Sequence, residues 1–193
     1  MVTEAKTNEI AQRIFKMAVQ LFAQKGYAAT STREIVEAAG VTKPMLYYYF
    51  ESKEGLCRAA ITHHLDEFHE RLRDILASKL EPMALVEEMV WAHLDYCQQN
   101  KDFARLFYAL YFGPEGQEAG LDLQSCGNQG HELLAAGVAR LEGQIRKGSI
   151  DALTMSLHGL INIWVIAALK KDAKLSRKLA KQIVHDLLEG FGS

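Results

Sequence analysis

The segment from Thr30 to Lys53 constrains the fold more than any other stretch of this chain. Its apolar residues recur three and four positions apart, which is the spacing of a helix that buries one face. We expect Thr32 to cap a first short helix that buries Ile35 and Val36. Gly40 then ends this helix, because a residue without a Cβ adopts a left-handed turn at little cost.

A second short helix is expected directly after this turn. Thr42 can cap it, and Pro44 falls in its first turn, where a missing N–H is harmless. Leu46 and Phe50 are four positions apart and should both face the core, whereas Tyr48 lies on the opposite side. Two short helices joined by a tight turn form a helix-turn-helix, whose second helix can enter a DNA major groove.

Three consecutive tyrosines cannot all be buried on so short a helix, so we expect Tyr48 to point outward. Its ring can contact a thymine methyl group, and its hydroxyl can donate to a phosphate. The alternative is that the tyrosines only fill a small hydrophobic domain. The residues that we expect at a DNA surface are Thr32, Arg33, Thr42, Lys43, Pro44, Met45, Tyr47, Tyr48, Tyr49 and Lys53.

The stretch from Ile10 to about Ala59 closely resembles the DNA-binding domain of the TetR family of bacterial transcriptional regulators. The resemblance rests on the ordered blocks KGY, TSTREI, AAGV, LYYYF and SKEGL. It implies a homodimer with an all-helical ligand-binding domain, usually a repressor that a small molecule releases from its operator. It also implies that Lys53 contacts the DNA backbone, beside a helix N-terminus that suits a phosphate.

The whole chain predicts an all-α fold, because no segment shows the alternation of a strand. We divide it into a three-helix helix-turn-helix domain, residues 1–52, and a ligand-binding and dimerisation domain, residues 53–193. Residues 113–130 contain five glycines and read as a mobile connection with room for a helical turn, which could gate a pocket or be a plain linker. Outside the helix-turn-helix, helices are expected at about 7–25, 52–78, 83–99, 102–112, 131–147, 150–170 and 175–191.

The last two predicted helices have more apolar surface than one core can cover. Residues 150–170 are apolar nearly all round, and residues 175–191 carry two adjacent apolar stripes. They resemble the dimerisation helices of the TetR family, which implies a homodimer through these two helices. The alternative is that they complete the core of the monomer.

Aromatic residues concentrate on the central helices, as they do around pockets for apolar ligands. An ordinary helical core would have the same composition. If a pocket is present, a largely apolar compound that is uncharged or weakly anionic fits it best. The residues that we expect to line it are His63, Phe68, Trp91, Tyr96, Phe107, Tyr108, Tyr111, Asn162 and Trp164.

Composition excludes several other classes. The net charge is −2, and residues 1–55 hold seven basic and six acidic side chains, so a basic DNA footprint must come from placement. Three scattered cysteines without CxxC spacing predict a reducing compartment and no zinc site. No catalytic motif, cofactor loop or metal motif is evident, so we predict neither an enzyme nor a cofactor. The apolar run at residues 160–169 is too short to span a membrane, which predicts a cytoplasmic protein.

The sequence therefore predicts a DNA-binding transcriptional regulator with two partners, double-stranded operator DNA and a small-molecule effector. The leading hypothesis is a dimeric repressor on a palindromic operator, released by that effector. One alternative is a family member that binds DNA without an effector. The other is a helical interaction domain whose helix-turn-helix is unused.

Overall fold

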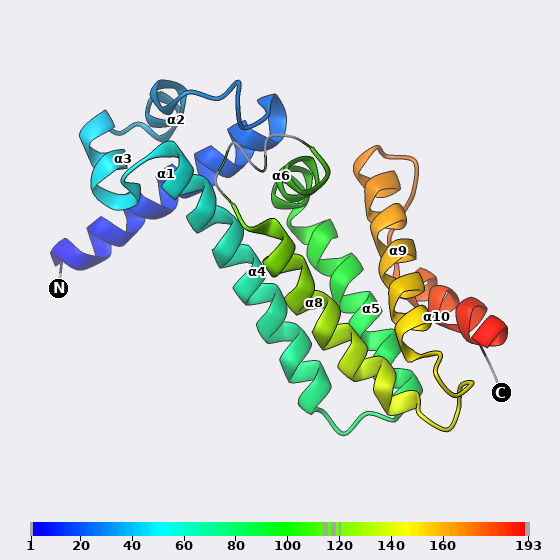
Figure 1. Cartoon of the computed structure of the whole chain (residues 1–193). Helices are drawn as coiled ribbons and strands as arrows, with labels where there is room; N and C mark the ends of the chain where they lie inside the picture. Colours follow the sequence, from blue (N-terminus) through cyan, green and yellow to red (C-terminus); the bar gives the residue numbers. More distant parts are fainter. Residues whose placement is uncertain (1, 114–115, 117–118, 120, 192–193) are drawn as a thin grey trace. The chain divides into compact units, whose positions relative to one another are not determined.

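The computed structural model describes residues 2–113, 116, 119 and 121–191, with side chains described for residues 9–113, 116, 119, 121–123 and 127–189. Among these residues the structure is helical and contains no strand, which confirms the predicted all-α class (Figure 1). The elements are α1 (Val2–Lys25), α2 (Thr32–Ala39), α3 (Lys43–Phe50), α4 (Lys53–Ala77), α5 (Pro82–Gln99), α6 (Lys101–Phe112), α8 (Leu123–Val138), the 3₁₀ turn η1 (Ala139–Leu141), α9 (Ile150–Leu169) and α10 (Arg177–Phe191).

The chain forms two compact units. The first contains residues 1–65 and 102–124, and the second contains residues 66–101 and 125–193. Helix α4 begins in the first unit and ends in the second. The boundary at residue 52 that we drew from the sequence separates functions rather than packing units, and it stays a prediction.

In the first unit, α2 packs against both α1 and α3. The side chains that hold the three helices together are fully buried and come from each of them: Ile14, Ala18, Phe22, Ile35 and Leu46. The predicted inward positions Ile35, Val36 and Leu46 are thus confirmed, whereas Phe50, also predicted to face the core, is half-buried. Their burial fixes which side of α3 faces away from the core.

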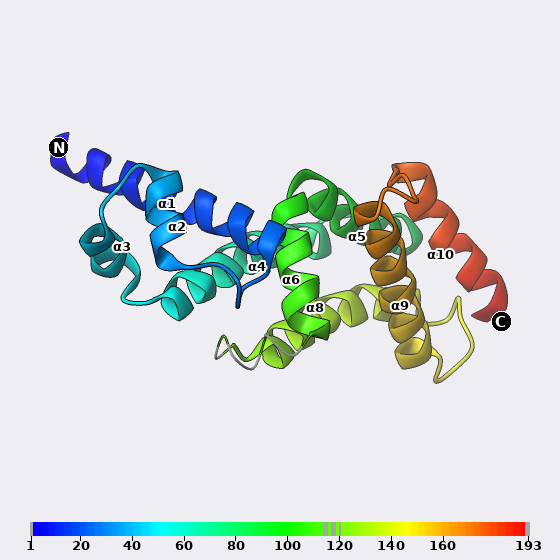
Figure 2. The same cartoon turned by 90° about the horizontal axis from the view of Figure 1, so that it is seen from above.

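In the second unit, α10 packs against α5 and α9, and α5 packs against α9; Figures 1 and 2 show these three helices from two directions. The buried side chains of α5 recur at helical spacing: Leu85, Val86, Met89, Val90, Ala92, Leu94, Tyr96 and Cys97. These residues occupy more than one side of α5, which is why other helices cover it on several sides.

Helix α1 begins at Val2 rather than near residue 7, and α8 differs from the prediction at both ends. Helix α8 begins at Leu123, so the predicted connection is wrong over residues 123–130. Gly127 and Gly130 have low helix propensity and suggest a loop locally, yet both lie within α8. The helix also ends at Val138 rather than near Lys147, and Gly143 and Gly148 continue in left-handed turns with φ of +90° and +79°. Of residues 113–122, positions 114–115, 117–118 and 120 lie outside the described residues.

The cap of α2 also differs from the prediction. Ser31, not Thr32, is the N-cap residue, and its Oγ accepts from the backbone N–H of Glu34 at 3.2 Å. The Glu34 carboxylate accepts the N–H of Ser31 in return at 2.9 Å, which completes a capping box. Ser31 is the N-cap residue because it stands three residues before Glu34, which can form the second half of the capping box. Thr32 stands three residues before Ile35, which cannot.

Candidate nucleic-acid interface and internal cavity

Helix α3 buries Leu46 in the core, half-buries Tyr49 and Phe50, and exposes its other side chains. Leu46 is 0% exposed, whereas Tyr48 is 78% exposed, as the helical spacing predicts. The Tyr48 and Tyr49 rings meet edge to face with centroids 5.0 Å apart, and Tyr49 is half-buried. The side chains exposed beside Tyr48 come from the helix start and from its flanks: Thr42, Lys43, Pro44, Met45 and Tyr47.

The start of α3 leaves polar groups directed outward. Thr42 is the N-cap residue, but its side chain makes no capping hydrogen bond. Pro44 lies in the first turn, as predicted, where it removes one N–H that would have had no helical partner. The Met45 N–H already donates to the Thr42 carbonyl at 3.0 Å, so the exposed Thr42 hydroxyl and Lys43 ammonium are the groups here that suit a phosphate.

The turn between α2 and α3 is held from α1. Gly40 has φ of +63°, so the turn uses the left-handed conformation that glycine tolerates. The guanidinium of Arg13 donates to the carbonyl oxygens of Ala39 and Gly40. Arg13 was not among the predicted site residues, because the spacing within the motif says nothing about a partner from α1.

Lys53 is engaged within the first unit. Its Nζ donates to the carbonyl oxygens of Tyr27 at 2.9 Å and Thr30 at 3.1 Å, and lies 4.2 Å from the centroid of the Tyr27 ring. The Tyr27 hydroxyl donates to Glu54 at 3.1 Å. The first turn of α4 thus fixes the loop between α1 and α2, while a DNA contact by Lys53 stays a prediction.

Acidic side chains offset two of the cations on this surface. Arg33 Nε lies 2.7 Å from Glu37 Oε1, one helical turn away, and both side chains are exposed. Lys25 Nζ lies 2.5 Å from Glu34 Oε1. Hydrogen bonds from Lys25 and from Ser31 lower the pKa of Glu34 to about 2. Half-exposed Thr32 adds a neutral hydroxyl, and the DNA roles of Thr32 and Arg33 stay predictions.

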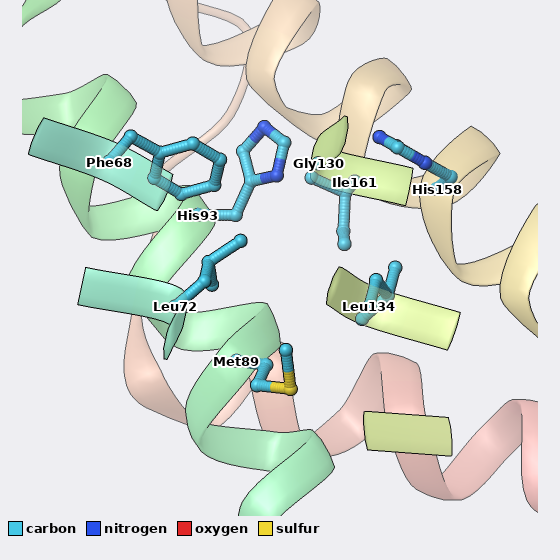
Figure 3. A pocket seen from close by; sticks show the side chains of 8 residues that line it. All are labelled: Phe68, Leu72, Met89, His93, Gly130, Leu134, His158 and Ile161. Carbon is cyan, nitrogen blue, oxygen red and sulfur yellow. The ribbon is translucent and has the colours of Figure 1, made fainter. Parts of the chain in front are cut away.

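The second unit contains a small cavity of about 20 Å³ (Figure 3). On the same scale one water molecule needs ~10–15 Å³, so the cavity as it stands admits a single water-sized group. Four helices contribute its lining: Phe68, Leu72, Met89, His93, Gly130, Leu134, His158 and Ile161.

Of the nine predicted ligand-binding residues, Phe68 lines this cavity. Its ring packs against Tyr96, whose hydroxyl donates to Glu67 at 2.9 Å. The Trp91 ring lies under the Arg177 guanidinium at 5.4 Å. His63 is exposed rather than inward, since its position on α4 sets it edge to face with Phe15. The others lie half-buried on α9 or along α6 of the first unit: Asn162, Trp164, Phe107, Tyr108 and Tyr111, the last of them exposed.

Four histidines gather at the cavity, and we refer to His69, His93, His131 and His158 as the histidine cluster. His131 and His158 are stacked with centroids 5.5 Å apart, and their Nδ1 atoms are 3.3 Å apart. The His93 ring lies 6.1 Å from that of His158. His69 is 2% exposed, and its Nδ1 has no hydrogen-bond partner among the described residues.

Burial keeps much of this cluster neutral. It lowers the pKa of His93 to about 3, with smaller effects from His158 and His69. Burial also lowers the pKa of His69 and of His158. The four histidines come from four separate stretches of the chain and follow no metal-ligand spacing, so the sequence could not show that they lie together.

Helix α9 exposes much of its apolar surface. In the part of the chain that the structure describes, one helix has the length and apolar composition needed to cross a membrane. It is Ile150–Leu169, with a mean hydropathy of 1.7. Only 28% of its apolar stretch is buried. Met155 and Ile163, eight positions apart on one side, are 63% and 64% exposed. Part of the apolar surface predicted for residues 150–170 is therefore uncovered in the single chain.

Known proteins resemble the N-terminal part of the chain in sequence. Residues 14–60 match the family described as "Bacterial regulatory proteins, tetR family". The HTH-type transcriptional regulator YerO of Bacillus subtilis is 33% identical over 114 residues, 58% of this chain and 39% of that protein. The HTH-type transcriptional repressor KstR2 of Rhodococcus jostii is 36% identical over 77 residues, 40% of this chain and 38% of that protein. These matches span about two fifths of each relative.

A solved structure extends the likeness to nearly the whole chain. The TetR-family transcriptional regulator from Bordetella parapertussis is 28% identical, with a TM-score of 0.75, and the match covers 93% of this chain and 94% of that one. The likeness therefore includes the helices after the helix-turn-helix. Taken with the geometry of α2 and α3, it shows that this chain belongs to the TetR family of bacterial transcriptional regulators.

Proposed function

We propose that this chain is a cytoplasmic transcriptional regulator that reads a palindromic operator as a homodimer, with one α3 in each of two major grooves. The observation that carries the proposal is the 78% exposure of Tyr48 on a helix that Leu46 anchors in the core. A large aromatic side chain held outward on a rigid helix is suited to base and phosphate contacts. The likeness to HTH-type regulators supports the same function rather than an enzymatic one.

The dimer would form through α9 and α10. The exposed stripe containing Met155 and Ile163 is supporting evidence, since apolar side chains on a largely uncovered helix favour association. A self-complementary interface would also place two copies of α3 about a twofold axis, matching the symmetry of a palindrome. The apolar character of α9 is then that of an interface helix in a cytoplasmic protein.

The regulator would be a repressor that an effector releases from DNA. Helix α4 is continuous through both units, so a ligand in the second unit can act on the DNA-reading unit through a single element. Release requires that the ligand prefer the state that does not bind DNA.

A second candidate is a regulator that binds DNA without an effector. The observation that favours it is the size of the cavity, which admits only one water-sized group. An effector of drug size would need side chains around the cavity to move apart.

The test is a selection of bound fragments from genomic DNA, followed by anisotropy titration of the best fragment. Native protein is compared with Tyr48→Ala and with Tyr111→Ala, an exposed tyrosine of α6, as the control. We expect an inverted repeat that binds two chains, with affinity lost in Tyr48→Ala and kept in Tyr111→Ala. Absence of any enriched sequence, even after refolding without small molecules, would contradict the proposed function.

A further inference from the structure

We propose that the cavity of the second unit binds the carboxylate of an apolar weak acid, and that the histidine cluster takes up a proton as the acid binds. The proposal rests on the proposed function, because this acid would be the effector. It adds the chemical class of the ligand, the residues that recognise it and a dependence of binding on pH.

The cavity has one kind of polar group. His93 and His158 are the polar side chains among its eight lining residues, and the other six present carbon, sulfur or a glycine backbone. His131 is not part of the lining, but its Nδ1 contacts the Nδ1 of His158. His69 adjoins the wall at Gly130, where a Cβ would lie 3.4 Å from His69 Nε2. Figure 3 shows His93 and His158 on different helices, and the centroids of their rings lie 6.1 Å apart.

This arrangement favours an anion over a cation. No carboxylate is present among the lining residues, so an ammonium group would enter without a counter-charge. Two carboxylates on neighbouring turns are already engaged. Glu67 accepts from the Tyr96 hydroxyl at 2.9 Å, and Asp95 accepts from Arg71, also at 2.9 Å. Imidazole N–H groups, in contrast, can donate to a carboxylate in either protonation state.

The stacked pair has a place for the added proton. At 3.3 Å one Nδ1 carries the hydrogen and the other accepts it, so the donating ring has a basic Nε2. A proton taken from solvent onto that Nε2 leaves the shared hydrogen bond intact and places one positive charge beside the carboxylate. No bond to carbon is made or broken.

The charged groups around the histidine cluster do not protonate it in the absence of a ligand. On α4, Asp66 raises and Arg73 lowers the pKa of His69, so the two oppose each other. On α5 the neighbouring ring is that of His93, which lies beside His158 of α9. On α8, Gln129 hydrogen-bonds to His69, and His131 contacts His158. Without a ligand, burial keeps His93 and His158 neutral, and an anion in the cavity would reverse that preference.

The size of the cavity limits which part of the ligand it holds now. The cavity admits one water-sized group, so a carboxylate with its three heavy atoms requires small shifts of the lining, and a hydrocarbon tail requires displacement of side chains such as Met89 and Phe68. Methionine adapts readily because its side chain is unbranched and flexible.

Titration calorimetry of the full-length protein with octanoate, 1-octanol and octylamine tests the proposal. We expect octanoate to bind at least about tenfold more tightly than either analogue, and more tightly as the pH falls from about 8 to about 6, on the order of tenfold per pH unit if one proton is taken up. Two buffers of different ionisation enthalpy give the proton number directly, which should lie between zero and one. Equal binding of the amine or the alcohol, no binding of any of the three, or no proton uptake would each overturn the proposal.

Variants locate the proton. His158→Gln and His131→Gln keep a hydrogen-bonding side chain but cannot become cationic, so each should reduce proton uptake and octanoate affinity. His185→Gln is the control, because His185 is exposed on α10 and pairs with Glu87 at 2.9 Å. If one of these two variants fails to fold, the other variant still tests the proposal, as does the number of protons that the wild-type protein takes up on binding octanoate. DNA binding by the unliganded protein, measured in parallel, separates failure of this inference from failure of the proposed function.

Discussion

The ammonium of Lys53 lies 2.9 Å from the carbonyl oxygen of Tyr27 and 4.2 Å from the centroid of its ring. Lys53 is the first residue of α4, and Tyr27 belongs to the loop that follows α1. A second bond, to the carbonyl of Thr30, brings the ammonium to the start of the helix-turn-helix. The lysine of the SKEGL block thus joins three parts of the DNA-reading unit, whatever it contributes to DNA contact.

Lys53→Ala should lower the free energy of unfolding of the first unit by about 1–3 kcal/mol, because two backbone carbonyls lose a charged donor in a half-buried place. Chemical denaturation measures this loss. Lys43→Ala is the matched control, since the exposed Lys43 ammonium should contribute less than about 0.5 kcal/mol to stability. Equal stability of both variants would mean that Lys53 does not hold the loop.

Gly40→Ala should destabilise the first unit by about 1–2 kcal/mol, because an L-residue at φ of +63° has its Cβ too close to the carbonyl oxygen. The added Cβ would also approach the Arg13 guanidinium to 3.1 Å. Gly40→Asn separates the two effects, since asparagine tolerates the left-handed conformation but also carries a Cβ. If thermal unfolding shows both variants equally destabilised, the contact with Arg13 rather than the backbone conformation is responsible.

The helix-turn-helix could be predicted from the sequence because its determinants are local. Gly40, Pro44 and Leu46 each obey a rule that involves only neighbours within a few positions. Arg13 and the carbonyl partners of Lys53 could not be predicted, because they come from α1 and its loop, more than twenty residues away.

The second unit was harder to predict for the same reason. The start of α8 was missed because Gly127 and Gly130 resemble a loop locally, although both lie within the helix. The cavity was missed because His93, His131 and His158 come from three different helices. Aromatic content indicated a core, but it could not show which side chains surround an open space.

Tyr48→Ala should weaken binding to the selected operator by roughly 1–3 kcal/mol and relax its sequence preference, because a contact to base edges is lost. The 78% exposure of Tyr48 predicts little change in thermal stability. Tyr48→Phe keeps the ring and removes the hydroxyl, so it should retain the preference for a base while losing a phosphate contact. Anisotropy titrations against operator and scrambled DNA measure both. A loss that is equal on the two DNAs would argue against base contact by this ring.

Met155→Glu and Ile163→Glu should each weaken the dimer, because a carboxylate would have to be buried in an apolar interface. Sedimentation velocity over a concentration series measures the shift toward monomer. Phe112→Glu on α6 is the control, since Phe112 is 62% exposed but does not belong to α9 or α10. If Phe112→Glu alone produces monomers, association occurs through another surface.

Stability should decrease as the pH falls below about 6.5, because the folded protein keeps buried His93 neutral. The pKa of His93 is about 3 in the folded chain against 6.5 for an ordinary histidine. Between these values the unfolded chain binds a proton that the folded chain does not, so acid favours unfolding, with a slope of up to about 1.4 kcal/mol per pH unit for one group. Burial of His69 and His158 acts in the same direction.

Denaturant titrations between about pH 5 and 8 measure this slope and largely exclude carboxylates such as Glu34, whose pKa is about 2. His93→Gln should lower the slope by the contribution of about one proton. His185→Gln, on the exposed side of α10, should leave the slope unchanged. A slope unaffected by His93→Gln would show that this histidine takes up its proton equally in the folded and unfolded chains. His93 would then be hydrated in the folded protein, and the cavity would be open to water rather than closed around neutral imidazoles.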